Sequence, residues 1–200
     1  MVKKKLELPM KNRDLIKETG YENFLKKTDI IRITMIAKSN YSHLLWFKII
    51  YIFGLNINEF INIRVSNIDF LNRKLLIEDR KNRKRRTLAI PDHIINELRI
   101  QCCHKVEDDF LFTGRLGSLH VRTVQKLFKK ISDEFGSKIN VPLLKKSLIY
   151  HLYQENWDEE IIVRFFGIYQ RRTVLKTLKE IKKTENEKYR HLDSIFKKIK

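Results

Sequence analysis

The densest group of side chains that could do chemistry is a run of cations between residues 80 and 86. Guanidinium and ammonium groups bind phosphate through charge-assisted hydrogen bonds, and a hairpin carrying them can grip a nucleic-acid backbone. A solvated turn without a ligand is the alternative interpretation. The basic residues of the run are Arg80, Lys81, Arg83, Lys84, Arg85 and Arg86.

Other cations stand near the starts of three expected helices, and at the last of these, near Arg171 and Arg172, backbone N–H groups also favour phosphate. We predict that they bind duplex DNA together with the basic run. Contacts of this kind give affinity and salt dependence, whereas sequence specificity needs base contacts, for which Asn56, Gln125 and Arg122 are guesses. The predicted DNA-binding residues are Lys81, Arg83, Lys84, Arg85, Arg86, Arg122, Lys126, Lys145, Lys146, Arg171 and Arg172.

The whole chain is strongly basic, with 42 Lys and Arg against 24 Asp and Glu and a net charge of +18. Such a field attracts polyanions. Codon bias is an alternative source of lysine, and a protein-interaction module of that origin predicts absent or salt-insensitive DNA binding. Membrane-surface binding ranks last because the cations do not follow one amphipathic helix with an exposed apolar face.

The sequence predicts neither a metal nor a cofactor. Cys102 and Cys103 are adjacent, which excludes an ordinary disulfide framework, and His104 beside them lacks a second ligand pair at metal spacing. A reducing compartment fits these thiols. The apolar stretch Leu44–Leu55 is too short to span a bilayer, and no signal peptide is visible, so we expect a cytoplasmic, nucleoid-associated protein.

The elements that must position these residues are mostly helical, since Gly and Pro are scarce and long segments have helical apolar periodicity. Three short β-favouring runs, 65–69, 74–78 and 87–90, interrupt the helices. We therefore expect a mainly α domain (α+β) with a small three-stranded antiparallel sheet. Its parts are an N-terminal arm (1–27), the domain itself (28–180) and a C-terminal helix (181–200). Expected helices are 28–37, 41–53, 57–63, 92–99, 121–135, 143–155, 159–166 and 173–200.

Several segments together resemble the catalytic domain of tyrosine recombinases, the phage integrase family, over about residues 28–180. Leu44–Phe60 is similar to the first signature, a buried helix, a Thr-Gly-Leu-Arg turn and Ile-Ser-Glu-Leu. Ile63–Asp69 resembles the start of the sheet, and Arg80–Ile90 resembles the Gly-Lys-Gly-x-Lys-x-Arg hairpin. Asp109–Phe112 and the helix from Val121 follow in order. The resemblance implies this family's fold and duplex DNA as a partner.

In active members, two arginines, a lysine and histidine-type residues surround the scissile phosphate, and a tyrosine attacks it. The matching positions lack most of these groups: asparagine has no charge, proline no side-chain donor, and an aliphatic hydroxyl has a far higher pKa than a phenol. The resemblance therefore implies a catalytically inactive DNA-binding protein, acting in DNA architecture, regulation, or replicon or mobile-element maintenance. The positions are occupied by Asn56, Lys81, Pro142, Lys145, Ile168 and Thr177.

Two alternatives concern the C-terminal part. A divergent recombinase could use a displaced tyrosine, Tyr169 or Tyr189, although we interpret both as packing or surface aromatics. Members of this family often dock their last helix into a neighbouring protomer, which implies homo-oligomerisation on DNA; packing onto its own domain is the other interpretation. The residues at helical spacing here are Leu192, Ile195, Phe196 and Ile199.

Overall fold

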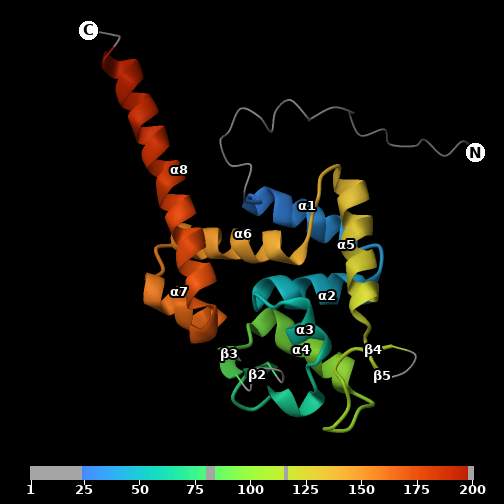
Figure 1. Ribbon diagram of the computed structural model, residues 1–200. Coiled ribbons are helices and arrows are strands. Elements are labelled where there is room, and N and C mark those ends of the chain that lie inside the picture. Colours follow the sequence, from blue (N-terminus) through green and yellow to red (C-terminus); the bar gives the residue numbers. More distant parts are fainter. Residues whose placement is uncertain (1–23, 80–83, 115–116, 198–200) are drawn as a thin grey trace, which may run out of the picture.

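The computed structural model describes residues 24–79, 84–114 and 117–197 (Figure 1). Helices dominate both the N-terminal and the C-terminal parts, and a small sheet lies between them in sequence. The helices are α1 (Lys27–Ala37), α2 (Tyr41–Ile52), α3 (Ile57–Ile61), α4 (Asp92–Cys102), α5 (Val121–Phe135), α6 (Val141–Gln154), α7 (Glu159–Phe166) and α8 (Arg171–Lys197).

The sheet has the predicted three antiparallel strands, in the order β1 (Ile68–Asp69), β2 (Lys74–Asp79) and β3 (Lys84–Ala89). β2 and β3 pair along their whole length, from Lys74 opposite Ala89 to Asp79 opposite Lys84. The mainly α architecture with a small three-stranded sheet is thus confirmed. The C-terminal half of the basic run belongs to β3 rather than to a turn, because it continues this ladder.

Two local predictions were wrong. The strand expected over 65–69 is mostly a 3-10 turn, Val65–Asn67, because the Asn67 side chain accepts a hydrogen bond from the Arg64 amide at 2.8 Å. The loop expected around Gly114 contains a second, two-stranded hairpin, β4 (Thr113–Gly114) and β5 (Gly117–Ser118).

The apolar core has two connected parts, and α6 contributes to both. The larger part surrounds α2, whose residues Leu45, Phe47, Ile49 and Ile50 are buried, as its nearly continuous apolar sequence predicted. The smaller part lies among α6, α7 and α8. Within the described ranges, none of the helices combines the length and apolar character needed to cross a membrane.

The turn between α2 and α3 packs directly on α7. Gly54 in this turn has φ +58°, and a Cβ built there would lie only 2.3 Å from Cε1 of Phe166. A glycine is therefore required both for the backbone conformation and for the approach of the ring. This contact brings the start of α3 close to the end of α7, where the candidate site is found.

Candidate nucleic-acid interface

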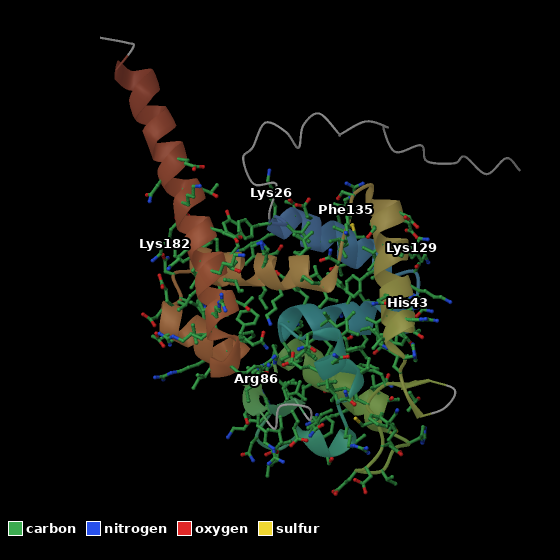
Figure 2. The ribbon with its side chains drawn as sticks, viewed as in Figure 1. Lys26, His43, Arg86, Lys129, Phe135 and Lys182 are labelled. Carbon is green, nitrogen blue, oxygen red and sulfur yellow. The ribbon has the colours of Figure 1, made fainter. Side chains whose placement is uncertain are left out.

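A buried ion pair joins the sheet to the helices. The Arg86 guanidinium, on β3, donates to both carboxylate oxygens of Glu59 on α3, with Nη2 3.3 Å from Oε2. The two side chains are only 4% and 1% exposed. Figure 2 shows Arg86 where the sheet meets the C-terminal helices. The guanidinium of Arg86, which we predicted to bind DNA, is thus engaged inside the protein.

Tyr169 completes this cluster from the 3-10 turn η3 (Ile168–Gln170) between α7 and α8. Its hydroxyl donates to Oε1 of Glu59 at 2.7 Å and accepts a hydrogen bond from Nη1 of Arg86. Burial and the hydrogen bond to Glu59 raise the pKa of Tyr169, so the phenol stays protonated. We interpreted Tyr169 from the sequence as a packing or surface aromatic; the place of its hydroxyl in a buried polar cluster is not evident from the sequence.

Burial and the charges of the cluster together shift two further pKa values. Burial alone would raise the pKa of Glu59, but hydrogen bonds and positive charge from Arg86 outweigh burial and hold it below its usual value. Lys145 on α6 is half-buried, and its Nζ lies 5.3 Å from the centre of the Phe166 ring. Burial lowers the pKa of Lys145 to about 8, because the attraction of Glu59 only partly compensates it.

Two residues that the sequence resemblance matches to catalytic positions of the family have structural roles here. The Asn56 side chain caps α3: its Oδ1 accepts from the Glu59 amide at 2.8 Å, and Glu59 accepts from the Asn56 amide at 2.9 Å. Thr177, which the sequence resemblance matches to the nucleophile position, is 1% exposed inside α8, and its hydroxyl donates to the Thr173 carbonyl at 3.0 Å.

The remaining family positions are spread out. Ile168 is 73% exposed beside the buried cluster. Pro142 is exposed at the start of α6. It lines a pocket of about 840 Å³, and Ile57, Gln125 and Lys129 are among the other residues that line it. Lys81 lies outside the described residues. The structure therefore brings Lys145 and the neighbours of Asn56 together, while Pro142 and Ile168 face two different pockets.

A second pocket, of about 560 Å³, opens between β3 and the α7–α8 connection. Gly167 shapes it, since its φ of +93° and a Cβ position 2.6 Å from Cε1 of Tyr169 leave no room for a side chain. Arg164 was missed in the sequence, although it stands one helical turn before Ile168. The lining residues are Arg85, Arg86, Arg164, Gly167, Ile168 and Tyr169.

The other predicted DNA-binding cations lie on opposite sides of the domain. Arg122 and Lys126 are exposed on α5, whereas Arg172 is exposed at the start of α8. Figure 1 shows α5 and α7 at opposite ends of α6, and Figure 2 shows Lys129 far from Arg86. A ligand that contacts both groups must therefore extend across the domain, as a duplex can.

Several of these cations also have intramolecular partners. Arg171 donates two hydrogen bonds to Glu160, at 2.8 and 2.5 Å, and Lys146 pairs with Glu180 at 3.0 Å. These pairs are on the surface, where ion pairs contribute little to stability, so phosphate can compete for the cations. Lys81 and Arg83 lie outside the described residues, as does the side chain of Lys84.

In the part of the chain that the structure describes, no three His, Cys, Asp or Glu residues are grouped to hold a metal ion. Cys102 and Cys103 are free thiols.

Comparison with known proteins identifies the fold and the family. The tyrosine recombinase of Pseudothermotoga lettingae is 24% identical over 149 residues, 72% of this chain and 52% of the relative. Tyrosine recombinase XerA of Pyrococcus furiosus is 26% identical over 140 residues, 68% of this chain and 49% of the relative. The chain thus spans about half the length of these relatives.

Solved structures show the same fold. XerA recombinase superimposes with a TM-score of 0.68 at 15% identity, covering 81% of this chain and 64% of that one. XerH recombinase, in a post-cleavage complex with palindromic difH substrate, gives 0.69 at 18% identity, covering 84% and 52%. The phage integrase family matches residues 23–183. Because this match covers most of the chain, the chain belongs to the phage integrase family of tyrosine recombinases.

Proposed function

We propose that this chain binds duplex DNA without cleaving it, as an architectural or regulatory protein or in the maintenance of a replicon or mobile element. The observation that carries the proposal is the burial and hydrogen bonding of Thr177, which the sequence resemblance matches to the position of the family's nucleophile. Its hydroxyl is buried in α8 and donates to the Thr173 carbonyl. An aliphatic alcohol held in this way is neither acidic enough nor accessible enough to attack phosphorus.

The cap formed by Asn56 supports the same proposal. Active members use a guanidinium at this position to stabilise charge on the reacting phosphate, whereas Asn56 has no charge and its carbonyl oxygen already accepts the Glu59 amide. DNA binding itself is supported by the net charge of +18 and by the exposed cations of α5 and α8. XerH, which shares the fold, was solved bound to its difH substrate.

The test combines binding with a covalent trap. Fluorescence anisotropy with a random duplex of about 30 base pairs should show binding that weakens steeply with salt, because each phosphate contact releases counterions. A nicked suicide duplex incubated in parallel should give no covalent protein–DNA adduct. An adduct would contradict inactivity, and no binding at low salt would contradict the DNA-binding role.

The contacts of Tyr169 favour a second candidate, strand cleavage by a displaced tyrosine. Its hydroxyl donates to the Glu59 carboxylate at 2.7 Å, which places Glu59 to accept the phenol proton, although its lowered pKa makes Glu59 a weak base. In that reaction the phenol oxygen would bond to phosphorus, Glu59 would take the phenol proton, and the departing deoxyribose oxygen would take a proton from water. An adduct formed by the natural chain and by Tyr189→Phe, but lost in Tyr169→Phe, would establish this function.

Self-association on DNA through the C-terminal helix is a separate part of the proposal. In Figure 1, α8 extends well beyond the body of the domain, which leaves its end available to another subunit. Sedimentation of the full chain with and without DNA, beside a Phe196→Asp variant, tests it. We expect the natural chain to form larger species that the variant lacks; a monomer under all conditions would contradict this part alone.

A further inference from the structure

The pocket that Pro142 lines, here called the α5–α6 pocket, lies between α5 and the start of α6 and has a volume of about 840 Å³. Phe128, Ile139 and Val141 line it and belong to the buried core, so its floor is apolar. An apolar floor that is open at the surface favours a partner with an exposed apolar side chain.

Positive charge predominates at the edge of the α5–α6 pocket. Lys129 on α5 and Lys138 in the α5–α6 connection line it, and both are exposed. Among the described lining residues, Asp133 is the only acid. A partner that carries an acidic group beside its apolar side chains would therefore match this pocket in charge as well as in polarity.

The start of α7 presents such a group of side chains, here called the α7 tip, which consists of Trp157, Asp158 and Ile161. Trp157 is 41% exposed and Ile161 is 51% exposed, so both have apolar surface in solvent. The Trp157 ring meets the Phe165 ring at 90°, with 6.2 Å between the centroids, and this contact holds the tryptophan against α7. A rigid, exposed aromatic side chain is the usual anchor of a protein interface.

Asp158 supplies the acidic group of the α7 tip. It is exposed at the N-cap of α7, where it accepts the Glu160 amide at 2.7 Å. The charges of Glu159 and Glu160 are already compensated, because these residues pair with Lys182 and Arg171. Asp158 is therefore the acid of this segment whose charge remains for a partner.

The α7 tip and the α5–α6 pocket lie far apart in one molecule. Figure 1 shows α5 and α7 at opposite ends of α6, and Figure 2 shows Lys129 and Lys182, the partner of Glu159, on opposite sides of the domain. A contact between the two surfaces must therefore join two copies. Such a head-to-tail contact uses a different surface on each copy, so it extends to further copies in a ring or a filament.

We propose that the α7 tip of one copy of this chain docks in the α5–α6 pocket of a second copy. Trp157 and Ile161 cover the apolar floor, and Asp158 pairs with Lys129 or Lys138. One pocket buries little surface, so the association is weak and depends on protein concentration. It needs neither DNA nor the C-terminal helix.

The test is sedimentation without DNA, up to about 0.1 mM protein because the interface is small. Every chain carries Phe196→Asp, which removes association through the C-terminal helix. We expect this parent chain to associate as its concentration rises. Adding Trp157→Ala/Ile161→Ala, which removes the tip, or Lys129→Glu/Lys138→Glu, which reverses the charge of the pocket edge, should weaken self-association roughly tenfold or more.

The decisive measurement mixes these two variants. One retains an intact pocket and the other an intact tip, so the mixture should form a one-to-one complex although neither variant associates alone at the same concentration. All four replaced side chains are exposed, and circular dichroism checks that each variant is folded. A contact between identical surfaces would not be restored by mixing.

The matched control is Lys74→Glu/Arg99→Glu in the same parent chain, which makes the same change of net charge at exposed cations of β2 and α4. It should associate as the parent does. A parent chain that stays monomeric, unchanged association in the tip or pocket variant, or a mixture without a complex would each overturn the inference. The proposed DNA binding is measured separately by anisotropy and does not depend on these outcomes.

Discussion

The Arg86 guanidinium and the Glu59 carboxylate face each other in the interior, with side chains 4% and 1% exposed. The pair joins β3 to α3, and the Tyr169 hydroxyl, bound to both residues, extends the connection to the α7–α8 corner. Three segments distant in sequence therefore meet at one carboxylate. A charge withdrawn from water in this way has to be compensated by its partner, so the cluster is sensitive to the loss of any one member.

The first prediction concerns Glu59→Gln. This change leaves the Arg86 charge buried without its counter-ion, and removing one partner of a buried pair costs about 3 kcal/mol or more. We expect the free energy of unfolding, measured by urea denaturation at neutral pH, to fall by roughly that amount. The control is Glu155→Gln, which removes the exposed partner of Lys27 and should leave the free energy of unfolding almost unchanged. Equal losses in both variants would contradict the assigned importance of burial.

The second prediction is a pH dependence caused by Lys145. Its pKa in the folded chain is about 8, against an ordinary value of 10.5. Between these two pH values the unfolded chain holds a proton that the folded chain has released, so the free energy of unfolding must rise with pH through this window. Urea titrations of the natural chain and of Lys145→Met should diverge there, the natural chain gaining stability relative to the variant. Parallel profiles would show that Lys145 is not desolvated.

The third prediction separates a steric cost from a backbone cost. Gly54 and Gly136 both have positive φ, +58° and +85°, but only Gly54 lacks space for a Cβ, since Phe166 would lie 2.3 Å away. Alanine at either position incurs the penalty of a left-handed backbone, about 1 kcal/mol. Gly54→Ala should cost a further 1–3 kcal/mol, approximately, because the ring must move. A thermal denaturation series that ranks Gly136→Ala as equal or worse would contradict the packing of the α2–α3 turn on α7.

The fourth prediction assigns phosphate contacts to α5. Arg122→Ala and Lys126→Ala each remove an exposed cation, so each should lower the slope of log affinity against log salt by about one counterion. The loss should be similar for random duplexes of different sequence, because phosphate contacts carry no sequence information. Arg99→Ala, an exposed cation on α4, is the control and should leave the slope unchanged. An unchanged slope in the α5 variants would show that Arg122 and Lys126 do not contact the DNA phosphates.

Much of the fold was determined by local patterns. Apolar periodicity is a property of consecutive residues, so the helices Tyr41–Ile52, Val121–Phe135 and Glu159–Phe166 were predicted almost to the residue. The net charge and the family resemblance also follow from the sequence alone. The 3-10 turn at Val65–Asn67 was not predicted, because a single side-chain hydrogen bond, and not the local β propensity, determines its backbone conformation.

The chemistry of individual cations was decided only by the tertiary structure. Arg85 and Arg86 are neighbours of the same type in one basic run, yet alternation along β3 sends one outward and the other inward to Glu59. Tyr169 and Glu59 are far apart in sequence and meet only because Gly54 lets α7 approach α3. The sequence determined which elements form and how charged the chain is; which charges reach solvent depends on packing between distant segments, because burial is a property of the assembled fold.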